Sequence, residues 1–124
     1  MSSAPTVLLV DPDGAVRDTL RAVLEEVGYK VIGYENGEAA LADLKDTCAA
    51  NLLVTEVRLP NLDGWQLARD ARRLCPGLPV VFIPSHDKSR SKQGKRSFVL
   101  PKPFGARAFL VAVQLMASPL VTYH

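Results

Sequence analysis

Short apolar runs alternate with amphipathic segments along this sequence, and this alternation limits the possible folds more than any other feature. The first run, residues 7–10, is apolar throughout, as expected of a central parallel strand covered on both faces. Asp13 follows as a suitable helix N-cap, and apolar residues at helical spacing then continue to Gly28. Because the same order recurs, the sequence predicts repeated βαβ units in an α/β domain.

The full pattern predicts five strands and four helices in a doubly wound parallel sheet. The strands are expected at residues 7–10, 31–34, 52–54, 80–83 and 98–100. The helices are expected at residues 13–28, 36–44, 63–74 and 105–116. Residues 85–97 contain no Leu, Ile, Val, Phe, Met or Ala, so no apolar stripe can hold a helix on the sheet there. We therefore expect a loop in place of a helix between the last two strands.

Length and composition indicate one globular domain. With 124 residues, 48% of them hydrophobic, the chain can bury a core without cross-links. We expect a domain at residues 1–117 and a C-terminal tail at 118–124, in a cytoplasmic protein without a membrane span. The net charge of +2 is too small to indicate nucleic acid or membrane binding. Cys48 and Cys75 have no metal or redox spacing, so we expect reduced thiols.

Charged residues follow the predicted strands at positions where functional groups gather in open parallel sheets. Asp11 comes after the first strand, Glu56 after the third and Lys102 after the fifth. In the expected strand order of 2-1-3-4-5, these ends meet in one pocket. Each residue alone reads as an ordinary polar loop residue, but two carboxylates and an ammonium at three such ends favour a site.

Three segments resemble the landmarks of response regulator receiver domains, the signalling modules of bacterial two-component systems. They are residues 7–11 (VLLVD), 56–64 (EVRLPNLDG) and 102–104 (KPF), and the resemblance covers nearly the whole chain. It implies a flavodoxin-like fold and a non-enzymatic role. In that family an acidic pair after the first strand holds Mg²⁺, and an aspartate after the third accepts a phosphoryl group from a histidine kinase. A Thr or Ser after the fourth strand and a lysine after the fifth contact the phosphoryl group.

The residues at these positions depart from the family pattern. Asp11 matches the first acid and Lys102 matches the lysine, but Pro12 stands where the second acid is expected. Glu56 occupies the phosphoacceptor position, and its longer side chain is expected to reach toward Lys102 and pair with it. Asp11 and Glu56 would form at most a weak Mg²⁺ site. No other cofactor is expected.

Two further positions affect the switching mechanism that the resemblance implies. Pro84 stands at the switch hydroxyl position, and Val99 at the position of the aromatic residue that changes rotamer on activation. We interpret the chain as an atypical, degenerate receiver (a pseudo-receiver) that binds a signalling partner without phosphorylation. Two alternatives remain: a receiver that still binds Mg²⁺ and responds to a histidine kinase, and an unrelated flavodoxin-like ligand-binding domain or enzyme.

Two regions are candidates for binding other macromolecules. The last helix carries only Arg107 and Gln114 as polar residues, so we expect Phe109, Val113 and Met116 to contribute to a partner interface or a homodimer. The tail or the basic loop could instead cover that helix. The basic loop contains Lys88, Arg90, Lys92, Lys95 and Arg96. A solvated loop is the favoured interpretation, and nucleic acid binding is disfavoured because no aromatic residue is interspersed with these charges.

Overall fold

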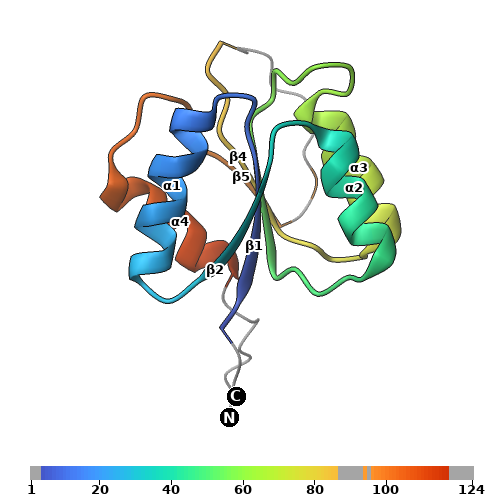
Figure 1. Ribbon diagram of the computed structural model, residues 1–124, viewed down its shortest axis with the longest axis horizontal. Helices are drawn as coiled ribbons and strands as arrows, with labels where there is room; N and C mark the ends of the chain where they lie inside the picture. The colour runs from blue at the N-terminus through green and yellow to red at the C-terminus, as the bar shows by residue number, and fades with distance from the viewer. Residues whose placement is uncertain (1–3, 87–93, 95, 118–124) are drawn as a thin grey trace.

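Five parallel strands form the centre of the molecule, with two helices on each face. The structure, a computed structural model, describes residues 4–86, 94 and 96–117. The strand order is β2-β1-β3-β4-β5, which confirms the predicted order. The strands are β1 (Thr6–Val10), β2 (Lys30–Tyr34), β3 (Leu52–Thr55), β4 (Val80–Phe82) and β5 (Ser97–Val99). Helices α1 (Gly14–Glu26) and α4 (Ala106–Ala117) cover one face, and α2 (Gly37–Asp46) and α3 (Gly64–Leu74) cover the other (Figure 1).

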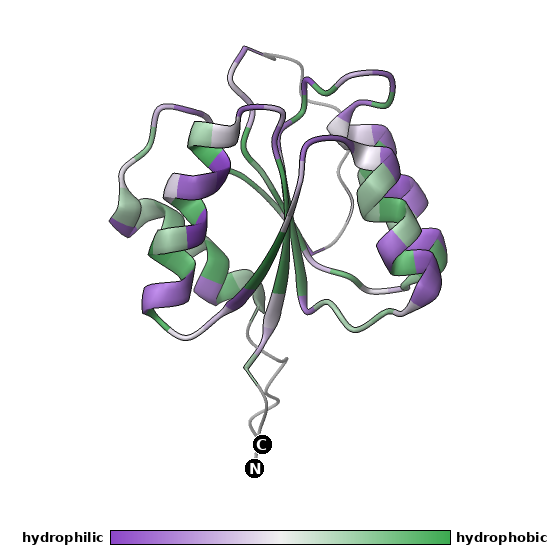
Figure 2. Ribbon diagram, in the orientation of Figure 1, coloured by the Kyte–Doolittle hydropathy of each residue, from purple (hydrophilic) through white to green (hydrophobic). Residues whose placement is uncertain are grey.

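The core is divided between the two faces of the sheet. Successive strand residues point to opposite faces, so Leu8 and Val10 pack under α2 and α3, while Val7 and Leu9 pack under α1 and α4. All four side chains are fully buried. The strands are accordingly apolar along their length, and the polar residues of α1, α2 and α3 lie mainly on their outer faces (Figure 2). Burial on both faces explains the continuous apolar runs in the sequence.

Side-chain caps fix the starts of three helices at the predicted residues. The carboxylate of Asp13 accepts hydrogen bonds from the N–H groups of Ala15 and Val16. Asn36 caps α2, and Asp63 caps α3 by accepting from the N–H group of Gln66 at 2.8 Å. Each cap satisfies N–H groups that have no partner within the helix.

The segment between β4 and β5 falls largely outside the described residues. Most of the predicted loop at residues 85–97 lies outside the described residues, as do four residues of the predicted basic loop, Lys88, Arg90, Lys92 and Lys95. The predicted tail at 118–124 also lies outside the described residues. The described fifth basic residue, Arg96, has φ 60° and donates from Nη2 to the carbonyl oxygen of Met116 at 3.5 Å. No described helix has both the length and the apolar character needed to span a membrane.

The expectation of reduced thiols is wrong for this structure. Cys48 and Cys75 form a disulfide, although 27 positions separate them in the sequence. The fold places Cys48 in the connection between α2 and β3 and Cys75 at the C-cap of α3, with their Cα atoms 5.7 Å apart. Spacing along the chain gave no sign of this pair because the helix ends meet only through tertiary packing.

The expected interface on the last helix also needs correction. Phe109 and Val113 are completely buried against the sheet, so they belong to the core of this chain. Met116 is half-buried on the same side. The apolar side chains that α4 exposes are Val111 at 49% and Leu115 at 66%. Because the helix is apolar nearly all round, its sequence does not reveal which side faces the core.

Candidate functional site

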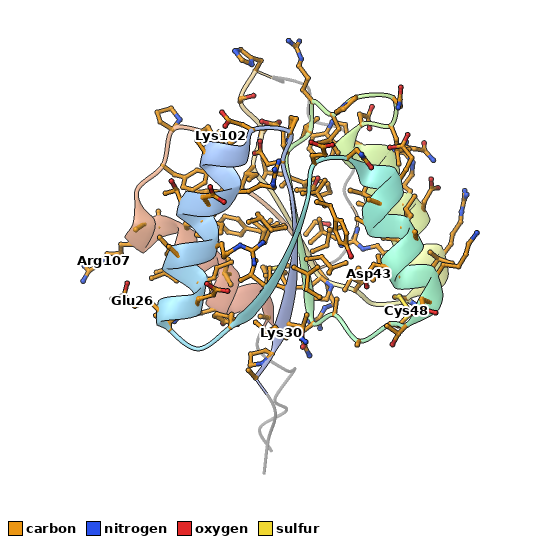
Figure 3. All side chains as sticks on the ribbon, viewed as in Figure 1. Glu26, Lys30, Asp43, Cys48, Lys102 and Arg107 are labelled. Atoms are coloured by element: carbon orange, nitrogen blue, oxygen red, sulfur yellow. A yellow bond between two sulfur atoms is a disulfide. The ribbon has the colours of Figure 1, made fainter. Side chains whose placement is uncertain are left out.

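Three charged side chains from different strands meet beyond the carboxyl ends of the sheet. Lys102 Nζ lies 2.7 Å from Asp11 Oδ2 and 3.0 Å from Glu56 Oε1. The side chains of Asp11 and Glu56 are almost completely buried, and Lys102 is about one-fifth exposed. Figure 3 shows Lys102 at this end of the molecule, above the strands. The contact between Glu56 and Lys102 that the sequence predicts is therefore present.

Main-chain hydrogen bonds to neighbouring strands set the positions of these residues. The N–H group of Glu56 donates to the carbonyl oxygen of Val10, and the N–H group of Asp11 donates to the carbonyl oxygen of Tyr34. The N–H group of Lys102 donates to the carbonyl oxygen of Pro84 at 2.9 Å. The peptide bond between Lys102 and Pro103 is cis. The site is thus built on rigid strand ends.

Main-chain N–H groups surround the carboxylate of Glu56. Its Oε2 accepts from the N–H groups of Val57 at 2.6 Å, Arg58 at 3.0 Å and Ser85 at 3.3 Å. Its other oxygen, Oε1, accepts from Lys102. We call the three N–H groups together with the Lys102 ammonium the anion cradle. Successive N–H groups that converge in this way form a general binding site for negatively charged groups.

Hydrogen bonds among the charged groups of the site outweigh the effect of burial on the pKa values of Glu56 and Lys102. Burial alone would raise the pKa of Glu56, but hydrogen bonds from Lys102, Ser85 and Arg58 hold that pKa below its usual value. Burial likewise lowers the pKa of Lys102, yet hydrogen bonds to Asp11 and Glu56 raise it above the usual value. Both groups are consequently charged at neutral pH.

The two carboxylates could hold a divalent cation only if the lysine moved. The Lys102 ammonium lies between Asp11 and Glu56, and Asp11 Oδ1 accepts from the N–H group of Asp13 at 2.9 Å. Pro12 is exposed and has no side-chain oxygen, and Asp13 is used as a helix cap. Among the residues that the structure describes, no three His, Cys, Asp or Glu side chains are grouped to bind a metal.

The two predicted switch positions differ in their surroundings. Pro84 is buried beside the site, where it supplies its carbonyl oxygen to Lys102 but has neither a hydroxyl group nor an N–H group. Val99 is 38% exposed on the edge strand β5. Neither side chain can form a hydrogen bond to the carboxylate of Glu56, so neither can report a change at that carboxylate through such a bond.

The start of α3 is packed directly against the Glu56 segment. The N–H group of Gly64 donates to the carbonyl oxygen of Val57 at 2.8 Å. A Cβ atom on Gly64 would lie 2.4 Å from the carbonyl oxygen of Glu56, which is closer than packing allows. The ring of the next residue, Trp65, packs against that of Phe82 at a tilt of 45°, with ring centroids 4.3 Å apart. Trp65 is therefore a packing residue near the site.

Sequence reasoning missed the main-chain part of the site and a hollow beside it. Main-chain N–H groups occur in almost every residue, so no residue pattern marks the cradle. The hollow, about 360 Å³ in volume, is lined by Ala15, Val16, Thr19, Leu20, Lys102, Pro103 and Phe104. Its apolar surface adjoins Lys102, so a partner bound there would lie next to the charged site.

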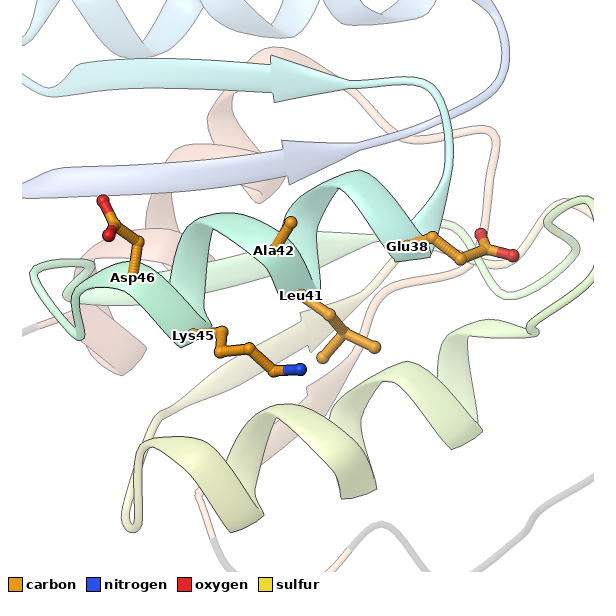
Figure 4. Close-up of a pocket in the computed structure, with 5 residues that line it drawn as sticks. All are labelled: Glu38, Leu41, Ala42, Lys45 and Asp46. Carbon is orange, nitrogen blue, oxygen red and sulfur yellow. The ribbon is translucent and has the colours of Figure 1, made fainter.

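A second hollow lies on the outer surface of α2. Its lining residues are Glu38, Leu41, Ala42, Lys45 and Asp46 (Figure 4). All of them come from one helix, and none belongs to the charged cluster. We therefore place the candidate functional site at the strand ends.

The chain is similar to known proteins of one family. The family model described as response regulator receiver domain matches residues 7–114. The receiver protein CpdR of Brucella abortus is 32% identical over 119 residues, covering 89% of this chain and 94% of that protein. The transcriptional regulator DctD of Rhizobium meliloti is also 32% identical, but this chain spans only 24% of its length. A crystal structure of a receiver protein from Sinorhizobium medicae superposes with a TM-score of 0.86 at 32% identity, covering 92% of this chain and 94% of that one.

Proposed function

The chain belongs to the response regulator receiver family, and from that premise we propose that it is a pseudo-receiver. In this role it is a protein-interaction module of bacterial two-component signalling that works without phosphoryl transfer. The carboxylate of Glu56 supports the proposal most directly, because it already accepts hydrogen bonds from three main-chain N–H groups and from Lys102. A buried negative group thus fills the cradle permanently.

The chemistry of phosphoryl transfer explains why this filling matters. Such reactions depend almost entirely on positioning, and a glutamate carries its carboxylate about 1 Å farther than an aspartate does. Here Oε2 is held by Val57, Arg58 and Ser85, and Oε1 by Lys102. Both oxygens already accept hydrogen bonds, so neither is free to attack phosphorus. The Glu56 carboxylate in the cradle therefore resembles a phosphorylated aspartate more than an unmodified one.

The same contacts favour weak or absent magnesium binding. Receiver domains commonly bind Mg²⁺ at the phosphorylation site, with metal–oxygen distances of about 2.1 Å. In this chain a cation shared by Asp11 and Glu56 would be placed against the Lys102 ammonium, and the two positive charges would repel each other. Pro12 supplies no replacement ligand. We therefore assign the neutralising role to the lysine.

The carboxylate imitates a phosphoryl group only in part. One carboxylate supplies about half the charge of a phosphorylated side chain and fewer acceptor oxygens. Pro84 and Val99 also lack the hydroxyl group and the aromatic ring that would relay a change at the site. The proposed result is one fixed conformation that does not respond to phosphorylation.

The partner in this proposal is another signalling protein in the cytoplasm, either a histidine kinase or an output protein. Val111 and Leu115 form an exposed apolar strip on α4, and Phe98 and Val99 are exposed on the neighbouring strand β5. Exposed apolar groups of this kind suit a protein partner or a second copy of the chain better than nucleic acid.

Incubation with a small phosphodonor tests the proposal. We expect intact-mass spectrometry to detect no phosphorylated protein after incubation with acetyl phosphate and Mg²⁺. A receiver with an aspartate at the acceptor position, treated in the same mixture, is the positive control. The variant Glu56→Asp places an aspartate at the acceptor position but keeps Pro12 and Pro84. It therefore distinguishes the effect of the acceptor residue from the effect of its surroundings. Stoichiometric phosphorylation of the unmodified chain, at Glu56 or elsewhere, would refute the proposal.

Magnesium titration tests the alternative of a working receiver. Trp65 lies in the first turn of α3, beside the Glu56 segment, so its fluorescence should report binding at the site. We expect little change with added Mg²⁺. Saturable quenching at low concentration would favour the alternative, provided that Asp11→Asn abolishes it.

A further inference from the structure

The disulfide lies far from the charged site and is not used by the proposed function. Cys48 is in the connection that links α2 to β3, and Cys75 is the C-cap of α3. Figure 3 shows Cys48 at the end of the molecule opposite Lys102. The bond joins the C-terminal ends of two helices that pack side by side on one face of the sheet.

The two sulfur-bearing residues differ in their access to solvent. Cys48 is exposed, whereas Cys75 retains only 7% of its surface and packs in the core that includes Leu44 and Ala71. A thiol from solvent must reach a sulfur atom to exchange with a disulfide. Cys48 is therefore the point of attack, and Cys75 is the protected leaving group and resolving thiol.

The bond holds one end of a helix whose other end supports Glu56. At its C-terminal end, α3 is tied to the α2–β3 connection through Cys75. At its N-terminal end, Gly64 contacts the main chain of Glu56 and Val57 without room for a Cβ atom. A change in the mobility of α3 would thus reach the segment that forms the anion cradle.

We propose that Cys48 and Cys75 form a reversible redox clamp that controls the mobility of α3 and the α2–β3 connection. Glutathione and thioredoxin keep most cytosolic thiols reduced, so a disulfide in that compartment is normally transient or regulatory. The intracellular setting is taken from the proposed function, but the clamp itself depends on neither Glu56 nor phosphorylation. The two proposals can fail separately.

The oxidising step balances with a low-molecular-weight disulfide such as oxidised glutathione. The thiolate of Cys48 attacks one glutathione sulfur, forms a mixed disulfide and releases one glutathione thiolate. The thiolate of Cys75 then attacks the Cys48 sulfur and releases the second glutathione. Two electrons pass from the cysteines to glutathione disulfide, which leaves as two thiols, and the two cysteine protons pass to water or to those thiols.

Equilibration in glutathione buffers tests whether the bond is reversible. The full chain is incubated without denaturant at graded ratios of reduced to oxidised glutathione, quenched with acid, alkylated and weighed. We expect two alkylated thiols at the reducing end and none at the oxidising end. In Cys75→Ser, a single glutathione should accumulate on Cys48. A bond that persists in reduced glutathione, or one that never forms in oxidised glutathione, would overturn the proposal.

Hydrogen exchange tests whether the bond acts as a clamp. In the unmodified chain, amides of residues 47–51 and of the last turn of α3 should exchange about tenfold faster after reduction, because their local opening is no longer restrained. The variant Cys48→Ser, which cannot form the bond, should exchange at the faster rate in either buffer. Equal exchange in the oxidised and reduced forms of the unmodified chain would refute the clamp.

Discussion

Replacing Lys102 by methionine tests whether the lysine is what allows two buried carboxylates to lie together. The substitution keeps a side chain of similar length and removes the ammonium that Asp11 and Glu56 share. Asp11 and Glu56 then face each other without a cation. The three N–H groups around Glu56 remain, so the variant isolates the contribution of the lysine.

The expected loss of stability follows from burial. Removing one partner of a buried ion pair costs about 3–5 kcal/mol. Lys102 is 21% exposed, so water can enter the vacated space, and the lower end of about 3 kcal/mol applies. With an unfolding entropy of about 2.1 cal/mol/K per residue, a chain of 124 residues loses about 4 °C in Tm per kcal/mol. The expected decrease in Tm is about 12 °C.

The pH dependence provides an independent check on the mechanism. The pKa of Glu56 is lowered in the folded protein, so its stabilising contribution is present above the unfolded pKa and is lost as the pH falls through the folded pKa. The pKa of Lys102 is raised, so its contribution is present below the unfolded pKa and is lost as the pH rises through the folded pKa. In Lys102→Met the pKa of Glu56 should rise, and the stability deficit should shrink as the pH falls from neutral toward 4.

Urea denaturation at several pH values measures both effects, and a double-mutant cycle with Glu56→Gln measures their coupling. The double variant should be more stable than the sum of the single losses predicts, by about 1 kcal/mol or more, because no buried charge repulsion remains. A loss below about 1 kcal/mol at neutral pH, or a deficit that does not change with pH, would show that the lysine is not needed to hold these carboxylates.

Two other substitutions test features around the site. Gly64→Ala should cost about 3 kcal/mol or prevent folding, because its Cβ atom would lie 2.4 Å from the carbonyl oxygen of Glu56. Gly105→Ala, where no atom lies within 4 Å of the added Cβ, is the matched control, and equal urea midpoints for the two variants would contradict the packing argument. Sedimentation should detect self-association of the unmodified chain that Leu115→Lys weakens, since Leu115 is 66% exposed, with Val111→Lys as a second probe of the same strip. A strict monomer at high concentration would show that the strip does not mediate a homodimer.

The sequence predicts those parts of the molecule that depend on local pattern. The positions of strands and helices follow from apolar runs and from caps such as Asp13 and Asp63, because each acts on neighbouring residues. The convergence of Asp11, Glu56 and Lys102 was also predictable, since parallel strands bring their carboxyl ends to the same edge of the sheet.

The features that were missed depend on tertiary contacts. The Cys48–Cys75 disulfide forms because two helix ends meet in space, and their spacing of 27 residues carries no signature. Phe109 and Val113 were assigned to an interface because nearly every position of α4 is apolar, and only packing decides which side is inner. Main-chain donors such as the N–H group of Ser85 belong to no recognisable residue type.

The main-chain origin of the cradle limits how this site can change over successive generations. Three of its four donors are N–H groups, which every residue except proline supplies, so ordinary substitutions at Val57, Arg58 and Ser85 leave them in place. These donors require a negative partner, whichever side chain at position 56 supplies it. A neutral, apolar residue at position 56 would leave these donors without an acceptor, whereas an acidic residue satisfies all four.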